Sequence, residues 1–398
     1  MRNRNPLIAL AVALATLAVA ACAADASSTP ATPDAAAQSA GEVRRVDRQF
    51  RVGSGKRLDV DLETGGSLEI SGWDQDVVSV NATLGGRDGA QSVVDFRETG
   101  AGLEIHTRYE GGRNNYSTSI AFEIKVPRRF DVQFNTMGGR IRLTDLEGTM
   151  NGETMGGALD LSNLRGRLDM TTMGGNVTLR ASDVDGKVST MGGEVLFEDV
   201  VGDVKGSSMG GKVIYKNVTS RSGKSTGSEV RITSMGGDIR VDDAPEGANV
   251  STMGGDIRIR SAAKFVRAKT MGGDINIDSV DGGVNATTMG GDMNVHMVGD
   301  PSSGNRSVEL TSMGGEIELT VPDGLSMDIH IEIARTKNNS GRDAQIFSDF
   351  PLQQRESADW EYRQGTPRKY LYGTGQVGGG RNKIVIKTIN GDVRLKRG

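Results

Sequence analysis

Acidic side chains recur at one fixed place in the C-terminal half of the chain, three residues after the methionine of a Met-Gly-Gly sequence. They are Asp238, Asp256, Asp274, Asp292 and Glu316. Carboxylates stacked about 5 Å apart on neighbouring strands would repel one another, and Ca²⁺ relieves such repulsion by oxygen ligation. In the earlier copies the same position is Arg140, Ala158, Asn176, Glu194 and Lys212. A calcium column would not alternate with cations, so the pattern favours a solvated turn position over a metal site.

The methionines of these Met-Gly-Gly sequences are a second chemical candidate, because thioethers bind Cu(I) and are oxidised reversibly. Soft-metal sites usually group Met with His or Cys within a few residues. The three histidines are scattered, and only His296 lies near other methionines, Met293 and Met297. Flexible apolar side chains at a fixed repeat position more often fill a core. We therefore expect an inward-facing methionine column, and no metal or other cofactor.

Catalytic motifs are not evident. The sequence contains no Gly-x-Ser-x-Gly, no His-Glu-x-x-His and no Cys/His pair. Enzymes built on long β-helices often cleave polysaccharides with grouped carboxylates, in grooves that carry aromatic side chains. Beyond Phe197 and Tyr215 the repeats contain almost no aromatic residues. A non-enzymatic role is favoured, and a polysaccharide-active enzyme stays open as the alternative.

The only cysteine, Cys22, ends a segment with the features of an export signal. Arginines precede an apolar stretch at residues 7–21, which is too short to span a bilayer as a helix but suits a secretory signal. The run Val19-Ala20-Ala21-Cys22 resembles a lipobox, in which the cysteine is acylated and becomes the new N-terminus. Ordinary signal-peptidase cleavage near Ala21 or Ala23 is the alternative. Because no acidic residue follows Cys22 directly, we expect an outer-membrane lipoprotein.

The composition limits the partners of the mature chain. Residues 22–45 are rich in Ala, Ser, Thr and Pro, which predicts a flexible tether after a signal peptide at 1–21. The whole chain has 47 basic and 51 acidic residues, well mixed, which argues against nucleic-acid binding. Glycine makes up 56 of 398 residues, about double the usual share. Such a chain requires an unusual architecture.

That architecture follows from an internal repeat. Met-Gly-Gly begins at Met137, Met155, Met173, Met191, Met209, Met235, Met253, Met271, Met289 and Met313, and most spacings are eighteen residues. If the methionine is position 0, positions +4 and +6 are apolar in every copy, whereas +3 and +5 are mostly polar. Such period-two alternation predicts one short strand per repeat with one buried face. A second strand follows a turn, as in residues 166–172 and 282–288.

One such unit cannot bury its own inner face, so the copies must stack. We predict an all-β parallel β-solenoid of about 18 residues per coil, with the apolar side chains in continuous columns. It spans residues 46–398: irregular N-terminal coils at 46–130, regular repeats at 131–325, and C-terminal coils with a cap at 326–398. Residues 220–228 and 299–306 are polar insertions, and 335–380 reads as a loop or end cap.

Several segments together resemble a known bacterial group. They are Gly72-Trp73-Asp74, Val126-Pro127, the run of Thr/Ser-x-Gly-Gly-Asp-Ile units and Thr388-Ile389-Asn390-Gly391-Asp392-Val393. The chain resembles the β-strand-repeat proteins described as candidate adhesins, the head-GIN-like exported β-solenoid lipoproteins. The resemblance implies a β-solenoid in an exported or membrane-tethered protein, and it carries no catalytic residues. Methionine at nearly every turn departs from the group's pattern.

The sequence therefore predicts a non-enzymatic, envelope-anchored lipoprotein that acts as an adhesin-like binding module or scaffold. Its partners would be the membrane, through a lipid on Cys22, and a protein or glycan on the outer face. Two alternatives stay open: a polysaccharide-active enzyme, and an envelope-stress sensor that acts on a neighbouring regulator.

Overall fold

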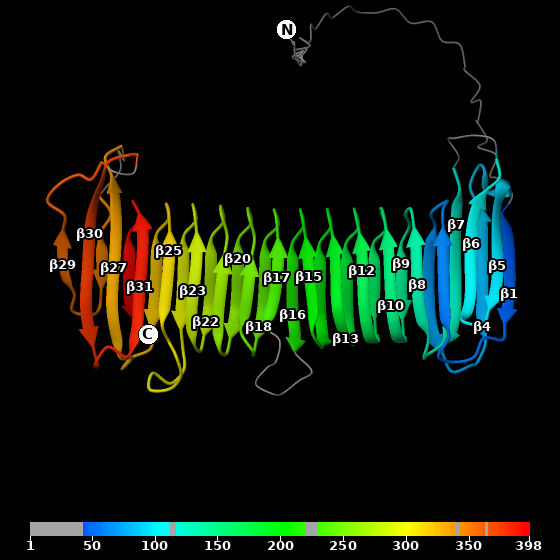
Figure 1. Ribbon diagram of the computed structural model, residues 1–398, viewed down its shortest axis with the longest axis horizontal. Coiled ribbons are helices and arrows are strands. Elements are labelled where there is room, and N and C mark those ends of the chain that lie inside the picture. Colours follow the sequence, from blue (N-terminus) through cyan, green and yellow to red (C-terminus); the bar gives the residue numbers. More distant parts are fainter. Residues whose placement is uncertain (1–42, 112–116, 220–228, 339–342, 363–364) are drawn as a thin grey trace, which may run out of the picture. The chain divides into compact units, whose positions relative to one another are not determined.

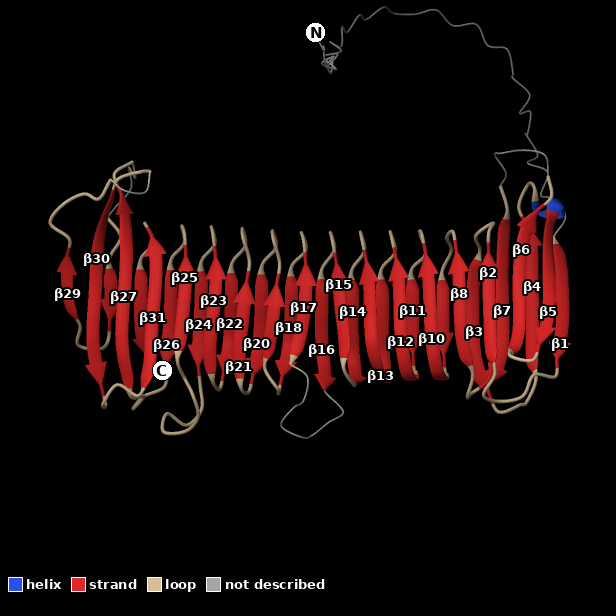
Figure 2. Ribbon diagram, in the orientation of Figure 1, coloured by secondary structure: helices blue, strands red, loops and turns tan. Residues whose placement is uncertain are grey.

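A computed structural model of the chain describes residues 43–111, 117–219, 229–338, 343–362 and 365–398. Cys22, the expected signal peptide, nearly all of the expected tether and the insertion at 220–228 lie outside the described residues. What is described consists of β-strands, turns and one short 3-10 helix, η1 (Gly89–Gln91) (Figure 2). No helix in that part of the chain has the length and hydropathy needed to cross a membrane. The all-β prediction is confirmed.

Each coil contributes one strand to each of two walls, here called sheet 1 and sheet 2, and the strands follow one another along one axis (Figure 1). In spatial order, sheet 1 consists of β5 (Ser92–Thr99), β6 (Gly102–Tyr109), β2 (Arg57–Leu62), β8 (Asp131–Thr136), β10 (Glu147–Thr154), β12 (Arg165–Thr172), the second half of β13 (Val177–Thr190), β15 (Val204–Ser208), β17 (Val230–Ser234), β19 (Ala248–Ser251), β21 (Phe265–Lys269), β23 (Gly283–Thr288), β25 (Val308–Ser312), β31 (Asn382–Ile389), β27 (Met327–Thr336), β30 (Arg368–Val377) and β29 (Gln353–Glu356).

Sheet 2 is built in the same way from the other strand of each coil. It consists of β1 (Arg44–Phe50), β4 (Val78–Gly85), β7 (Ser119–Pro127), β3 (Ser67–Trp73), β9 (Ile141–Thr144), β11 (Leu159–Ser162), the first half of β13, β14 (Val195–Val201), β16 (Val213–Thr219), β18 (Ile239–Ala244), β20 (Ile257–Ala262), β22 (Ile275–Val280), β24 (Met293–Met297), β26 (Ile317–Val321), β32 (Val393–Arg397) and β28 (Ile346–Ser348). Between the end strands all pairings are parallel, so the parallel β-solenoid is confirmed.

The apolar columns lie between the two sheets, as the alternation predicted. Ile257 pairs with Ile239 on one side and Ile275 on the other, and all three side chains are buried. Where an inner side chain is large, the facing position is small: a Cβ on Gly206 of β15 would lie 3.0 Å from the Phe197 ring of β14. Size is therefore balanced across the core, as close packing requires.

The inward-facing methionine column is wrong. All ten turn methionines are 44–57% exposed, and the position before each one, always Thr or Ser, points inward instead. In Thr190 the hydroxyl donates to the Gly175 carbonyl of the preceding coil, with 2.9 Å between the oxygens, and accepts from the Gly193 amide of its own turn. Successive strand residues face opposite sides, so an inward Thr at −1 places the methionine outside.

The second glycine of the turn is required by a close backbone approach between coils. A Cβ added to Gly193 would lie 2.0 Å from the carbonyl oxygen of Gly175, the equivalent glycine of the preceding coil. The first glycine, Gly192, has only ordinary contacts, from 3.6 Å. The two glycines of Met-Gly-Gly thus serve different purposes, and only the second is needed for stacking.

Both ends of the solenoid depart from sequence order. The coil formed by β2 and β3 stacks between β6–β7 and β8–β9, so the first copy is not the outermost. At the other end β31 and β32, the last copy in sequence, insert between β25–β26 and β27–β28. Antiparallel strands then cover the edges: β5, β4 and β1 at one end, β30 and β29 at the other. Such caps protect open strand edges from unwanted pairing.

Candidate binding surface

The acidic column at position +3 is a hydrogen-bonded ladder between coils. The Asp238 carboxylate accepts the Asp256 amide at 3.1 Å, and the Asp256 carboxylate accepts the Asp274 amide at 2.9 Å. Asp274 and Asp292 continue the series, which ends at the Glu316 amide. Each carboxylate therefore satisfies a turn amide of the next coil. This gives the aspartates a role in stacking that requires no metal ion.

The first member of that ladder is also paired with a cation. The Lys212 ammonium lies 3.0 Å from the Asp238 carboxylate, and this contact, with the Asp256 amide, lowers the pKa of Asp238. Among the described residues, no three His, Cys, Asp or Glu side chains are grouped so as to hold a metal ion. The structure also separates His296, on the outer face of β24, from Met293 and Met297, which are buried inside it.

An open hollow of about 550 Å³ lies on the outer face of sheet 1, across β21, β23, β25 and β31. Its floor forms because Phe265 pairs with Gly283 in the next coil, and Ser307 takes the equivalent place in the third coil, after the insertion. The missing side chain at Gly283 leaves space beside the phenyl ring. Outward residues of the four strands form the walls. These lining residues include Arg267, Asn285, Asn305, Glu309, Lys383 and Lys387.

The hollow is basic. Three cationic side chains, Arg267, Lys383 and Lys387, surround it, against one carboxylate, that of Glu309. The Glu309 carboxylate accepts a hydrogen bond from the Asn285 amide at 3.0 Å. The Arg267 guanidinium carbon lies 5.2 Å from the centre of the Phe265 ring, so a cation–π contact holds that cation at the rim. Lys387 pairs with Glu332 at 4.0 Å, whereas within the described chain no carboxylate lies within ion-pairing distance of the side chains of Arg267 or Lys383.

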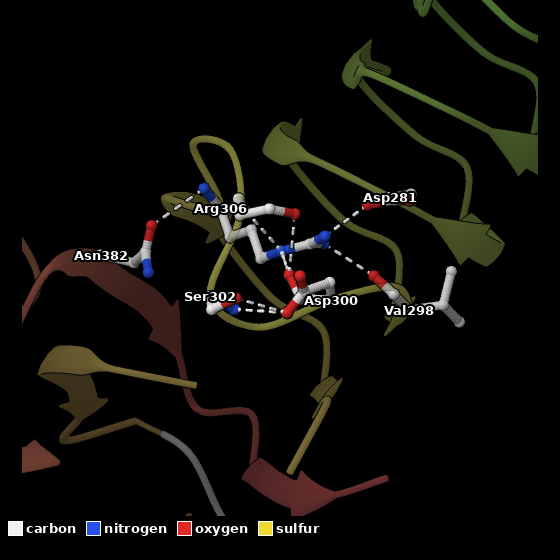
Figure 3. A network of polar contacts seen from close by, with 7 residues as sticks. Asp281, Val298, Asp300, Ser302, Arg306 and Asn382 are labelled. Atoms are coloured by element: carbon white, nitrogen blue, oxygen red, sulfur yellow. Dashed lines mark hydrogen bonds and ion pairs between the residues drawn. The ribbon is translucent and has the colours of Figure 1, made fainter. Parts of the chain in front are cut away.

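A buried arginine fixes one wall of the hollow. The Arg306 side chain is 2% exposed, although it belongs to the insertion predicted to be a polar loop. Its guanidinium pairs with Asp281 and donates to the carbonyls of Val298 at 2.7 Å and Asp300 at 2.8 Å (Figure 3).

The same arginine joins the insertion to the last strands in sequence. Its backbone amide donates to the Asn382 side chain at 2.9 Å (Figure 3). Asn382 precedes Lys383, whose amide donates to Ser307. The Arg306 contacts therefore set both Asn305 and Lys383 at the edge of the hollow, and a buried polar network of this kind rigidifies its surroundings.

A second hollow of about 550 Å³ lies on the same outer face, across β8, β10, β12 and β13. Its charged side chains are Glu153, Asp169 and Lys187, and the last two form an ion pair at 3.3 Å. The ion pair leaves Glu153 as the one unbalanced charge, and the Phe134 ring beneath is buried. This hollow lacks the free cations and partly exposed aromatic ring of the first one.

Sequence reasoning missed the basic hollow. Phe265 was not among the aromatic residues considered in the repeats. Phe followed by Gly at the same position of successive coils could have indicated a hollow beside the ring. The lysines of β31 could not be placed beside it, because β31 enters the stack out of sequence order. Cys22 lies outside the described residues.

Comparison with known proteins identifies the family. No curated protein was found to match the chain. Similar solved structures include a candidate cell adhesion protein from Clostridium sporogenes, 10% identical over 90% of this chain and 100% of that one, with a TM-score of 0.20. A candidate adhesin from Parabacteroides merdae is 13% identical over 64% of this chain and 97% of that one, with a TM-score of 0.38. A candidate lipid binding protein from Parabacteroides distasonis is 14% identical over 65% and 98%, with a TM-score of 0.33.

The family match covers nearly all of the solenoid. A sequence profile described as Toastrack DUF4097 matches residues 56–396, from β2 to β32. The match confirms the resemblance to the exported β-strand-repeat group that the repeat indicated. The chain therefore belongs to the Toastrack DUF4097 family.

Proposed function

We propose that the protein is a non-enzymatic binding module of the bacterial cell envelope, and that its basic hollow takes an acidic glycan. The observation that carries the proposal is the grouping of Arg267, Lys383 and Lys387 around a partly exposed Phe265. Carboxylate, sulfate or phosphate groups on sugars would pair with the cations. The amides of Asn285 and Asn305 supply donors and acceptors for hydroxyl groups.

The shape of the hollow supports a polymer rather than a small molecule. It is open and spans four strands, or about 14 Å at the usual strand spacing, which suits several sugar units. Small-molecule sites usually enclose most of the ligand, and this one does not. A chain laid across the strands would meet Arg267 on β21 and the two lysines on β31.

The chemistry of the hollow supports binding without cleavage. Hydrolysis of a glycosidic bond usually needs two carboxyl groups, one on each side of the scissile bond. Among the residues that line the hollow, Glu309 is the single acid, and its carboxylate is engaged by Asn285. The structure thus favours the binding module over the polysaccharide-active enzyme.

Anchoring to the envelope is proposed from the N-terminal sequence. The run Val19-Ala20-Ala21-Cys22 would direct acylation of Cys22, and residues 22–45 would tether the solenoid to the membrane. The two alanines after Cys22 favour the outer membrane. A tethered solenoid would present the long outer face of sheet 1 to the surrounding glycans.

Neutralising the two lysines of the hollow should weaken glycan binding. We expect the double variant Lys383→Gln/Lys387→Gln to bind an alginate hexasaccharide on the order of ten-fold more weakly than the parent protein, because two charge-assisted contacts are lost. Isothermal titration of both proteins at low and physiological salt measures this.

The matched control removes the same charge from the same face. Lys205 and Arg231 are outward neighbours on β15 and β17, away from the hollow, so Lys205→Gln/Arg231→Gln should leave the affinity within two-fold. An equal loss in both double variants would mean that the acidic chain is held by net charge alone. Absence of binding by the parent protein would refute the acidic-glycan assignment.

The anchor is tested independently of the ligand. Cys22→Ser should move the protein from the membrane fraction to the soluble fraction, because the serine hydroxyl cannot carry the thioether-linked lipid. Intact mass of the membrane-extracted parent protein should show acyl chains at its N-terminus. If Cys22→Ser fractionates like the parent, the anchoring proposal is wrong.

A further inference from the structure

The turn methionines vary less than the outward-facing side chains of the strands beside them. Ten regular coils carry Met at position 0, whereas the equivalent residue is Glu63 in the coil of β2 and Ile389 in the coil of β31. Outward-facing position +5, by contrast, varies among Arg, Asp, Thr, Leu, Ile, Asn and Glu. Even the buried positions +4 and +6 require only that the side chain be apolar. Within the ten regular coils, position 0 is therefore restricted to one residue type for a reason other than burial.

Stacking does not explain this restriction. The Thr or Ser at −1 bonds two coils together, and the second glycine is required by backbone contact. The methionine contributes a backbone amide to the ladder, as from Met191 to Thr172, which any residue except proline would supply. Its side chain stays about half exposed. The chain's other described methionines, Met150, Met170, Met293, Met297 and Met327, are all buried.

The exposed side chains form one continuous column. Successive turns are hydrogen-bonded, for example from Gly192 to Met173 and from Gly210 to Met191, at 2.9 Å each. The two insertions do not break the column, because the Gly236 amide still bonds to Met209 and the Met313 amide to Thr288. The backbones of neighbouring methionines are therefore about 4.8 Å apart throughout the column, which is the usual spacing of adjacent strands.

We propose that this methionine column binds Cu(I), with each ion held between the Sδ atoms of methionines on successive coils. Thioethers are soft ligands that select monovalent copper over hard cations. Two metal–sulfur bonds of about 2.3 Å span about 4.6 Å in a linear arrangement, which matches the spacing between coils. The flexible methionine side chain can adjust its Sδ atom to this distance.

The surroundings of the column suit a soft monovalent ion. Midway along it, an open hollow of about 300 Å³ is lined by Met191, Met209 and Met235 together with the hydroxyl-bearing residues Thr171, Thr172, Ser189, Thr190, Ser207, Ser208, Thr233 and Ser234. No carboxylate lines this hollow, so hard divalent cations lack the charged oxygen ligands that usually hold them. The proposal is independent of the glycan site, which lies on other residues.

Two variants with equal numbers of methionines test the pairing. Replacing Met155, Met191, Met235, Met271 and Met313 with leucine leaves five turn methionines, none on adjacent coils. Replacing Met137, Met155, Met173, Met191 and Met209 leaves five on consecutive coils. Leucine keeps the apolar volume, and the positions are exposed, so both variants should fold like the parent, as circular dichroism will show.

Cu(I) binding is measured without oxygen, by competition with bicinchoninate. We expect the parent and the consecutive variant to take Cu(I) from the chelator, the consecutive variant binding about two ions as two full pairs. The alternating variant should bind at least ten-fold more weakly. No uptake by the parent, or equal uptake by both variants, would overturn the proposal. Adsorption of all three proteins to lipid vesicles, with no difference in copper, would instead assign the column to apolar docking.

Discussion

Replacement of Ile257 by asparagine is expected to unfold several coils around β20. The Ile257 side chain is fully buried between Ile239 and Ile275, and the new amide would find no polar partner in that column. Loss of the apolar side chain and burial of an unpaired amide together should cost about 4 kcal/mol or more. Each coil contacts only its neighbours, so the loss should be local. Urea denaturation with peptide-resolved hydrogen exchange over residues 239–280 measures it.

The adjacent residue supplies the matched control. Arg258 points outward from the same strand, and its guanidinium pairs with Asp278 at 2.9 Å on an exposed surface. Arg258→Asn introduces the same residue one position along and should cost at most about 1 kcal/mol. Equal destabilisation by the two substitutions would show that the inner and outer faces of β20 have been assigned wrongly.

Much of the fold could be predicted because the copies of the repeat can be compared with one another, position by position. Apolar residues at +4 and +6 in every copy indicated one strand face, and a single coil cannot bury that face alone. The second strand was equally readable, as in Leu168, Met170 and Thr172, which alternate with polar residues and are all buried. Local alternation and stacking were sufficient for the solenoid.

The methionine column was predicted wrongly because residue type was given more weight than alternation. Leu168, Met170 and Thr172 all face inward, so the next residue, Met173, has to face outward. The alternation was visible, but the tendency of flexible apolar side chains to fill a core was given more weight. Paired backbone groups at the turn make the buried threonine hydroxyl favourable.

The order of the end coils could not be predicted from local pattern. β31 lies between β25 and β27, although the chain reaches it only after forming β28, β29 and β30. Only long-range pairing decides that arrangement. The basic hollow depends on it, since Lys383 and Lys387 reach Phe265 through β31. The basic hollow therefore could not be predicted from the sequence, whereas the solenoid could.

Replacement of Gly255 by alanine should destabilise the protein strongly. An added Cβ would lie 2.4 Å from the carbonyl carbon and oxygen of Gly237 and 2.6 Å from the Asp238 amide nitrogen. These are backbone atoms of the preceding coil, so they cannot rotate away as a side chain could. The coils would have to separate, which should cost about 2–3 kcal/mol. Neither Gly254 nor Gly255 has a positive φ, so the effect is steric.

The neighbouring glycine has the same turn but not the same contacts. A Cβ on Gly254 would come no nearer than 3.7 Å to any atom outside its immediate neighbours, in this case the Gly236 carbonyl oxygen. Gly254→Ala should therefore leave the free energy of unfolding within about 0.5 kcal/mol of the parent, or raise it slightly by restricting the unfolded chain.

The central claim is that Met-Gly-Gly is a stacking turn, in which the second glycine contacts the preceding coil and the methionine is exposed. It is tested most directly by measuring the free energies of unfolding of Gly255→Ala and Gly254→Ala side by side in urea. The stacked turn predicts a large loss for Gly255→Ala and almost none for Gly254→Ala. Equal losses, or a greater loss for Gly254→Ala, would contradict it.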